Sequence, residues 1–567
     1  MADFDDQPSH YTVQVPAPEN QQPAEGNDNF VFGHNCAAIN VDSLSPLPSQ
    51  MPFIWHTFVN NVDPFIKVLH LPTVNTIIQG LNGTITSLSP NMEALLFSIS
   101  LATITSMDEV GVVANFNTPK PQLISRYRLG AELALGRAKF VMTKDITVIQ
   151  AFVIYLSVLP YLGATESAWS LTGLLLRLAK SLGLHRANDG IRRTDLELET
   201  RRRLWWQICL LDSKTRRSNM ADLSISETSF DQVFPANIND TDLGSLLPTD
   251  HPSIPRTGDM TLCLIRCELW TLVQSLKASP AGREGKLGLF YETKLKIETK
   301  YLHPLGPGDT LGDYIKTMAS LFFAKAELFL HKPSATEASR VQNKHQVDCL
   351  LLRASVTVIS AVHALLTDPS WTRWRWQLSG TAPWHAIGIF LRHACSHPWA
   401  SETERVWSMV QRLAVPKEGQ NFAIWQPLMR LFTQTTQYRS RALDHVAVER
   451  TDELGLGERL TQLGIRGSTG GNANPVPEPD QNLWETSLSI DTDTEMPPFQ
   501  QSRDSLIDPD IIFYMASSHP TLQFPPINLE GLLQQPYAST TEQANDGSLP
   551  DWHLGDVGDI DMMWELF

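Results

Sequence analysis

Apolar residues recur at helical spacing through most of this 567-residue chain, and this pattern constrains the fold more than any other feature. Between about residues 51 and 450 they return every three or four positions, whereas the alternation typical of β-strands is nearly absent. We therefore predict an all-α protein with one large domain of stacked helix pairs. The longer helices are expected at residues 91–107, 123–142, 146–162, 168–182, 195–213, 260–276, 310–330, 344–366, 384–395 and 402–413.

Both ends of the chain differ from this middle part in composition and charge. Residues 1–50 hold seven acidic residues and no Lys or Arg, and residues 504–567 hold eleven and again none. Taking −7 and −11 from the net charge of −16 leaves +2 for residues 51–503. We predict a disordered acidic tail at 1–50, a helical domain at 51–450, and a disordered linker and acidic tail at 451–567.

The six cysteines are scattered, and the chain starts without a signal-peptide pattern, so reduced thiols in an intracellular protein are expected. Apolar runs such as residues 151–162 are shorter than the roughly 20 residues that span a bilayer, so no membrane contact is predicted. Cys263 and Cys267 stand four apart on an expected helix without further ligands nearby, and we interpret them as buried residues. No metal site and no cofactor is predicted.

The most informative segment begins with a leucine-rich helix and a capping motif. Leucines at helical spacing between residues 171 and 182 are followed by Gly183, which favours a left-handed helix stop. Thr194 and Glu197 have the spacing of a capping box, in which each side chain binds the other residue's backbone N–H. One helix is therefore expected to end at Gly183 and the next to begin at Thr194.

A basic triplet, Arg201-Arg202-Arg203, lies in this second helix. Glu197 and Glu199 precede Arg201 and Arg203 by four residues, the better orientation for a helical ion pair. We therefore interpret the triplet as a salt-bridged helix face or an interhelix clamp rather than a nucleic-acid patch. The tryptophans that follow, Trp205 and Trp206, are expected in the core rather than on a base-stacking surface.

The segment resembles the regulatory domain of fungal zinc-cluster transcription factors, also called the fungal-specific transcription factor domain or middle homology region. The resemblance covers roughly residues 53–413, with similar family features at 62–64, 70–73 and 384–386. Within the segment it is carried by Trp169, Gly173, Arg177, Gly183, His185, Arg201, Arg202, Arg203, Trp205, Trp206 and Asp212, and by Pro235, Asn237 and Asp240 in the loop at 234–243.

This resemblance implies a transcription regulator in the nucleus, pathway-specific for a biosynthetic gene cluster, whose helical domain controls its activity. The family reads DNA with six cysteines that hold two zinc ions, but residues 1–50 contain only Cys36, and the first Lys in the chain is Lys67. We expect DNA contact to come from a partner protein with a zinc cluster or from a zinc cluster missing from the gene model. A dimer of this chain is the alternative to an assembly with such a partner. The alternative is a protein without DNA contact that sequesters or represses a zinc-cluster factor.

The last seventeen residues interleave five acidic residues with bulky hydrophobic ones and hold no base. This composition is typical of a disordered activation segment that folds into a coactivator groove; the alternative is a terminal helix docked on the core. We expect the segment to contact coactivators or the transcription machinery through Trp552, Asp556, Asp559, Asp561, Trp564 and Phe567.

No catalytic residue is predicted. Nucleophile elbows, Walker loops, dinucleotide fingerprints and metalloprotease helices do not occur in the context that each requires. His185, His385 and His393 have no paired carboxylate or cysteine that the sequence identifies, and we interpret them as structural. The chain is therefore predicted not to be an enzyme.

Overall fold

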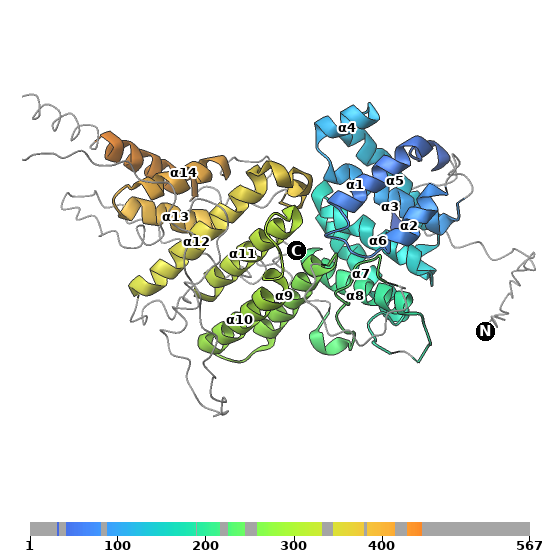
Figure 1. Cartoon of the computed structure of the whole chain (residues 1–567). Coiled ribbons are helices and arrows are strands. Elements are labelled where there is room, and N and C mark those ends of the chain that lie inside the picture. The colour runs from blue at the N-terminus through green and yellow to red at the C-terminus, as the bar shows by residue number, and fades with distance from the viewer. Residues whose placement is uncertain are drawn as a thin grey trace, which may run out of the picture. The chain divides into compact units, whose positions relative to one another are not determined.

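The computed structural model of the chain (Figure 1) describes residues 31–32, 41–80, 88–188, 190–215, 225–243, 258–331, 344–378, 383–413 and 428–444. In this part of the chain all regular structure is helical and there is no strand, which confirms the predicted all-α class. The predicted tail at 451–567 lies outside the described residues, as do most of residues 1–50. The chain divides into two compact units, which are described separately.

The first unit holds the described residues up to Phe390 and residues 408–413. Its helices are α1 (Met51–Asn61), α2 (Leu71–Gln79), α3 (Pro90–Ser106), α4 (Glu109–Phe116), α5 (Lys120–Arg137), α6 (Ile146–Val158), η6 (Leu159–Leu162), α7 (Thr165–Ser181), α8 (Asp195–Thr215), α9 (Thr261–Ala278), α10 (Arg283–Ile297), α11 (Thr310–His331), α12 (Lys344–Thr367) and η9 (Pro369–Leu378). Two helices, α13 (Trp384–Ser396) and α14 (Ser401–Leu413), contain residues of both units. All ten predicted helices are present, with ends shifted by no more than five residues.

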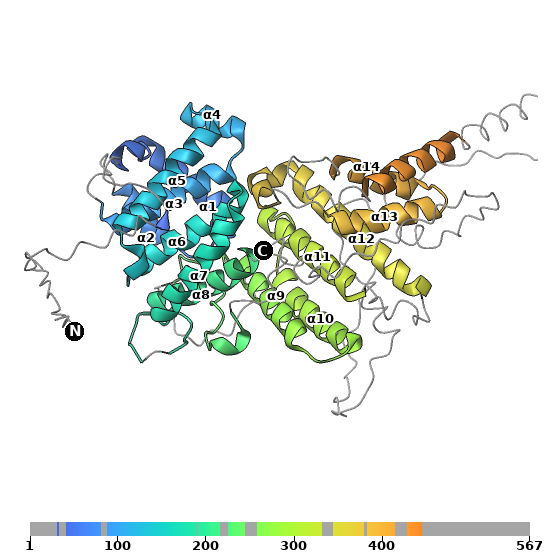
Figure 2. The ribbon, with the colours of Figure 1, turned by 180° about the vertical axis from the view of Figure 1, so that it is seen from behind.

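Helix α3 is the central helix of the first half of this unit. It packs against α1, α5 and α6, and the two opposite views in Figures 1 and 2 show α3, α5 and α6 side by side. Every residue from Glu93 to Ser106 is buried, as expected for a helix covered on all sides. Two of its buried hydroxyl side chains bond within the helix: Ser100 donates to the carbonyl of Leu96 at 2.7 Å, and Thr105 to that of Leu101 at 2.7 Å. Polar residues therefore occupy the core without unpaired hydroxyl groups at these positions.

The close approach of α5 to α3 depends on Gly130. A Cβ atom at this position would overlap the ring of Phe97, which is buried with 2% exposure. Gly130→Ala is therefore expected to lower the free energy of unfolding by about 1–3 kcal/mol, measured by chemical denaturation. Gly173→Ala on α7 is the matched control, because nothing lies within 4 Å of the place that its Cβ would take, and there alanine is expected to be neutral or stabilising by up to about 1 kcal/mol. Equal losses in the two variants would contradict this packing argument.

The turn between α7 and α8 has the geometry that the sequence predicts. Gly183 has a φ of 68°, in the left-handed region, and the N–H of Leu184 donates to the carbonyl of Ala179 at 3.0 Å. At the start of α8 the backbone N–H of Glu197 donates to Thr194 Oγ1 at 3.3 Å, and that of Thr194 to Glu197 Oε2 at 3.0 Å. The predicted helix stop and capping box are thus confirmed.

The second half of the first unit pairs α9 with α10 and α11 with α12. These four helices lie next to one another in both views (Figures 1 and 2). Residues 345–367 of α12 are long and apolar enough to cross a membrane, and this helix packs against α11 and η9. Such packing is what a core helix of a globular unit shows.

The second unit comprises, among the described residues, Leu391–Trp407 and a helix at 428–444. The ring of Trp407 lies 4.7 Å from that of Phe432. Arg439 binds Glu404 through two of its three guanidinium nitrogens, Nε to Oε2 at 2.7 Å and Nη2 to Oε1 at 2.5 Å. Aromatic contacts and an ion pair with two hydrogen bonds thus join the segments of this small unit.

Candidate functional site

Three segments that are far apart in the sequence meet around Asp240. Its carboxylate accepts a hydrogen bond from the backbone N–H of Leu71 at 2.9 Å and one from Arg203 Nη1 at 2.5 Å. Lys67 Nζ lies 3.7 Å from the same carboxylate. The segment after α1, helix α8 and the loop at 234–243 are therefore joined by one side chain that is only 2% exposed.

Glu199 is the second carboxylate of this group and binds the loop from the side of α8. It accepts from Arg203 Nε at 3.1 Å and from the backbone N–H of Ala236 at 3.1 and 3.2 Å. Arg202 Nη1 lies 3.6 Å from its other oxygen. Glu199 thereby positions the Arg203 guanidinium and the loop at the same time.

Asp63 completes the group through Lys67, with Nζ 2.5 Å from Asp63 Oδ2. We call Asp63, Lys67, Glu199, Arg203 and Asp240 the buried ion network, since every one of them is 2% exposed. His70 strengthens it by donating from Nε2 to the backbone carbonyl of Asp240 at 2.9 Å. Two cations face three carboxylates, so the charges are nearly balanced inside the protein.

The carboxylates of the network differ in acidity. Burial alone would raise the pKa of Asp240, but Lys67 and Arg203 outweigh it and hold this pKa below its usual value. For Asp63, burial raises the pKa by more than the attraction of Lys67 lowers it. The negative charge of the neighbouring Asp240 raises it further, so the pKa of Asp63 is about 6. Of these two carboxylates, Asp240 is therefore the more firmly ionised at neutral pH, and Asp63 takes up a proton more readily.

Asp63 is expected to make stability depend on pH. Because its pKa is raised from 3.8 to about 6 on folding, its favourable contribution is complete below about pH 4 and is lost as the pH rises through 6. The free energy of unfolding of the wild type relative to Asp63→Asn should fall by about 2–3 kcal/mol between pH 4.5 and 7, measured by urea unfolding. Titration of Asp240 lies below this range, because its pKa is lowered. Parallel pH profiles of the two proteins would contradict the assignment.

The basic triplet on α8 is an interhelix clamp. Arg201 is 6% exposed, and its Nη2 donates to the carbonyl of Leu182 at the end of α7, at 2.6 Å. Arg203 forms the predicted pair with Glu199, but this pair is buried rather than on an exposed helix face. Arg202 is the more accessible member and stays beside Glu199. The clamp interpretation is thus confirmed for Arg201, and the predicted helical ion pair is confirmed for Arg203 with Glu199.

The two tryptophans of α8 are core residues, as predicted. Trp205 is fully buried and Trp206 is 3% exposed. Trp206 Nε1 donates to the carbonyl of Val233 at 2.9 Å, and its ring lies 4.6 Å from that of Phe234 and 5.7 Å from that of Trp270. The aromatic contacts thus attach the loop at 234–243 to α8 and α9 next to the buried ion network.

The remaining predicted motif residues differ in how deeply they are buried. Asp212 on α8 and Pro235 in the loop are buried, whereas Arg177 on α7 is exposed and Trp169 is half-buried. Burial, and then the nearby Arg186, lower the pKa of His185. The predicted tail contacts, Trp552, Asp556, Asp559, Asp561, Trp564 and Phe567, lie outside the described residues.

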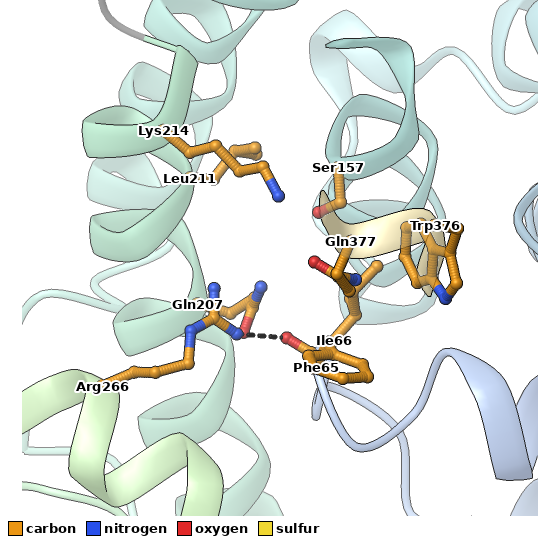
Figure 3. A pocket seen from close by; sticks show the side chains of 9 residues that line it. All are labelled: Phe65, Ile66, Ser157, Gln207, Leu211, Lys214, Arg266, Trp376 and Gln377. Carbon is orange, nitrogen blue, oxygen red and sulfur yellow. Dashed lines mark hydrogen bonds between the residues drawn. The ribbon is translucent and has the colours of Figure 1, made fainter. Parts of the chain in front are cut away.

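A small hollow lies between α6, α8, α9, η9 and the segment after α1, shown in Figure 3. The space inside it that a water-sized molecule can occupy is only about 10 Å³. In the close-up, Lys214 and Arg266 extend toward it from α8 and α9, and Ser157 and Gln377 face them from the other side. The sequence pattern did not single out Lys214 or Arg266, because isolated cations on amphipathic helices are usually solvated. In the structure Arg266 is buried and Lys214 is half-buried.

The described cysteines do not fit the two-zinc cluster of the family. Cys209, Cys263 and Cys267 are buried in α8 and α9, and Cys349 and Cys395 lie far from them in the sequence. Burial strongly raises the pKa of Cys209 and Cys267, so their thiols stay protonated rather than becoming metal ligands. Within the described ranges, no group of three or more His, Cys, Asp or Glu residues is arranged to hold a metal ion.

Comparison with known proteins identifies the part of the chain that contains this centre. Residues 55–244 match the model of the fungal specific transcription factor domain, a shorter range than the 53–413 expected from the sequence. The chain is 28% identical over 396 residues to the aurofusarin cluster transcription factor aurR2 of Gibberella zeae, an alignment covering 68% of this chain and 59% of that protein. It is 28% identical over 477 residues to the C6 finger domain transcription factor nscR of Aspergillus fumigatus, covering 76% of this chain and 58% of that protein.

A third relative is the pyriculol/pyriculariol biosynthesis cluster transcription factor 1 of Pyricularia oryzae, 31% identical over 230 residues, or 40% of this chain and 30% of that protein. The chain thus spans little more than half the length of the first two relatives. The family match encloses both ends of the buried ion network, Asp63 and Asp240. Residues 55–244 of this chain are therefore similar to the fungal specific transcription factor domain, and this range contains the buried ion network.

Proposed function

We propose that this chain regulates transcription of a fungal gene cluster that makes a secondary metabolite. The observation that carries the proposal is the match of residues 55–244 to the fungal specific transcription factor domain. Relatives named for the aurofusarin and pyriculol clusters support a role restricted to one pathway. The protein would act in the nucleus and without catalysis.

The helical domain is the regulatory part in this proposal, and residues 451–567 recruit a coactivator. The arginines of α8 are engaged with carboxylates and a carbonyl inside the domain, which argues against their use as phosphate contacts. DNA contact would come from a zinc-cluster partner or from a zinc cluster encoded outside these 567 residues. Zinc is therefore not assigned to the described part of this chain.

A reporter assay tests the activation segment. Residues 451–567 fused to a heterologous DNA-binding domain are expected to activate a reporter gene. Replacing Trp552 and Trp564 with alanine should reduce the output by about fivefold or more, because these rings supply the apolar contacts in a coactivator groove. Tyr537→Ala is the control, since Tyr537 lies in a stretch without acidic neighbours, and it should leave the output unchanged. Absence of output, or equal loss in all variants, would count against the activation role.

Deleting the gene in its host tests the pathway-specific role. Transcripts of the biosynthetic genes in one cluster are expected to fall, while those of unrelated clusters stay constant. Repression of the same transcripts on overexpression, with co-purification of a zinc-cluster factor, would instead support sequestration. The purified chain alone is expected not to bind a specific DNA duplex. Specific binding with a steep salt dependence would contradict the proposal that a zinc cluster outside these residues makes the DNA contact.

A further inference from the structure

A single aromatic side chain from the N-terminal part of the chain docks on the helical domain. The ring of Phe32 stacks on that of Phe140, with centres 5.3 Å apart and planes 24° apart, and it meets the ring of Tyr155 at 6.0 Å and 80°. Phe140 begins η5 (Phe140–Met142) and Tyr155 lies on α6; they are 0% and 1% exposed, whereas Phe32 is half-buried. We call Phe140 and Tyr155 the aromatic slot.

The walls of the aromatic slot are held by contacts of their own. The Tyr155 hydroxyl donates to Glu132 Oε1 at 2.5 Å, and Arg128 Nε donates to the same oxygen at 2.9 Å. The ring of Phe140 packs on that of Phe152 at 5.0 Å. These partners lie on α5 and α6, which are side by side in Figures 1 and 2. The slot is therefore largely formed in advance, and a docking ring does not have to order its walls.

Arg126 on α5 binds the N-terminal part of the chain at a second point. Its Nε donates to the carbonyl of Leu44 at 2.9 Å, and its Nη2 donates to the carbonyls of Ser43 at 3.1 Å and Ser45 at 2.7 Å. The short helix η3 (Val41–Leu44) packs against α5 here, with Val41 only 6% exposed. Arg126 thus binds main-chain atoms, while the aromatic slot accepts a side chain. Sites that dock extended peptides combine the same two kinds of contact.

We propose that the aromatic slot and Arg126 form one peptide-docking surface, and that its occupant is a strap of this chain that opens and closes as a unit. The strap is defined by its described residues, 31–32 and 41–45. One half-buried ring, Val41 and three hydrogen bonds hold it, whereas a central helix such as α3 is buried along its whole length from Glu93 to Ser106. Opening of the strap therefore needs less free energy than unfolding of the domain.

Opening of the strap would change the surface of the domain in two ways. It would uncover the aromatic slot on α6 and η5. It would also release the segment before Phe32 from α5 and α6, and this segment holds six acidic residues and no Lys or Arg. The strap thus controls both an apolar docking surface and the position of an acidic tail, and this role does not depend on the proposed function in transcription.

Limited proteolysis of the purified full chain tests the strap. Glutamyl endopeptidase in phosphate buffer cuts after Glu and Asp, and Asp42 lies between the two points of attachment. Cleavage after Asp42 requires an open strap, so its rate follows the open fraction. We expect this cleavage to be at least about 100-fold slower in the wild type than in a synthetic peptide of residues 38–50, which contains the same site. Cleavage after Glu25 reports that the protease is equally active in all samples.

Removing either attachment should open the strap. Phe32→Ala deletes the stacked ring and Arg126→Gln deletes most of the carbonyl contacts, and each is expected to speed cleavage after Asp42 by about tenfold or more. Two matched controls should leave the rate within about twofold. Leu47→Ala removes an apolar side chain of the N-terminal part that is 59% exposed, and Lys144→Gln removes an exposed charge close to η5.

Three results would overturn the proposal. Unchanged cleavage after Asp42 in Phe32→Ala would mean that the ring and Arg126 hold separate segments. Equal acceleration in Lys144→Gln and Arg126→Gln would mean that a general attraction between the acidic tail and basic residues holds the segment. Equal rates in the wild type and the peptide would mean that the surface is empty in solution. Tryptophan fluorescence shows that each variant is folded, since the chain has no Trp before Trp55, and the comparison of wild type with peptide needs no variant.

Discussion

Replacing Asp240 with asparagine is expected to lower the free energy of unfolding by about 3–5 kcal/mol. The Asp240 carboxylate accepts from the backbone N–H of Leu71 and from Arg203, and it lies 3.7 Å from Lys67. An asparagine side chain of the same shape carries no charge and turns an N–H group toward one of these donors. A buried cation would then lack part of its counter-charge, which costs more than the loss of one neutral hydrogen bond. Guanidinium unfolding followed by tryptophan fluorescence measures the change.

Asp242→Asn is the matched control for this substitution. Asp242 lies in the same loop, two residues away, and its side chain is exposed. Its replacement should change the free energy of unfolding by no more than about 0.5 kcal/mol. Equal effects at the two positions would mean that the buried ion network contributes nothing beyond the general charge of the loop.

Trp206→Ala is expected to cost about 3–5 kcal/mol, the second large effect. The substitution removes a ring that packs between Phe234 and Trp270 and leaves the carbonyl of Val233 without its donor. Because the same ring anchors the loop that carries Asp240, the expected loss includes part of the network. Chemical denaturation of the variant measures it.

Trp206→Phe separates the ring from its N–H group. Phenylalanine keeps most of the apolar contact but cannot donate to Val233, so a smaller loss of about 1–3 kcal/mol is expected. A loss below about 1 kcal/mol for Trp206→Ala would show that the loop is held without this ring. Combining Trp206→Phe with Asp240→Asn should give less than the sum of the separate losses, because both residues hold the same loop.

The sequence was sufficient to predict the long helices and several of their ends. Strong apolar periodicity and local capping residues act within a few positions, as at Thr194 and Gly183, and the structure agrees there. The shorter or atypical helices were missed. Helix α10 contains Gly285 and Gly288, which lower helix propensity, and α4 has only eight residues, too few for a clear period.

The candidate site was predicted only in part. The motif placed Arg203 and Asp240 in one domain. Their spacing in the sequence did not predict that they contact each other or Lys67. Lys214 and Arg266 carried no signal, because each looks like an ordinary cation on an amphipathic helix. Packing against helices from distant parts of the chain lowers the pKa of both side chains. The local sequence does not predict this packing.

Helix positions, caps and the internal pairing of α8 follow from the chain alone, because their contacts join residues at most five positions apart. The buried ion network and the hollow depend on the tertiary structure. Asp240 meets Leu71 across 169 positions, and Arg266 meets Phe65 across 201. Contacts at such separations form only when the free energy gained by packing the core offsets the entropy lost in bringing the segments together. The same packing removes water from the charges, and this gives Asp63, Lys214 and Asp240 properties that their residue types do not have in solution.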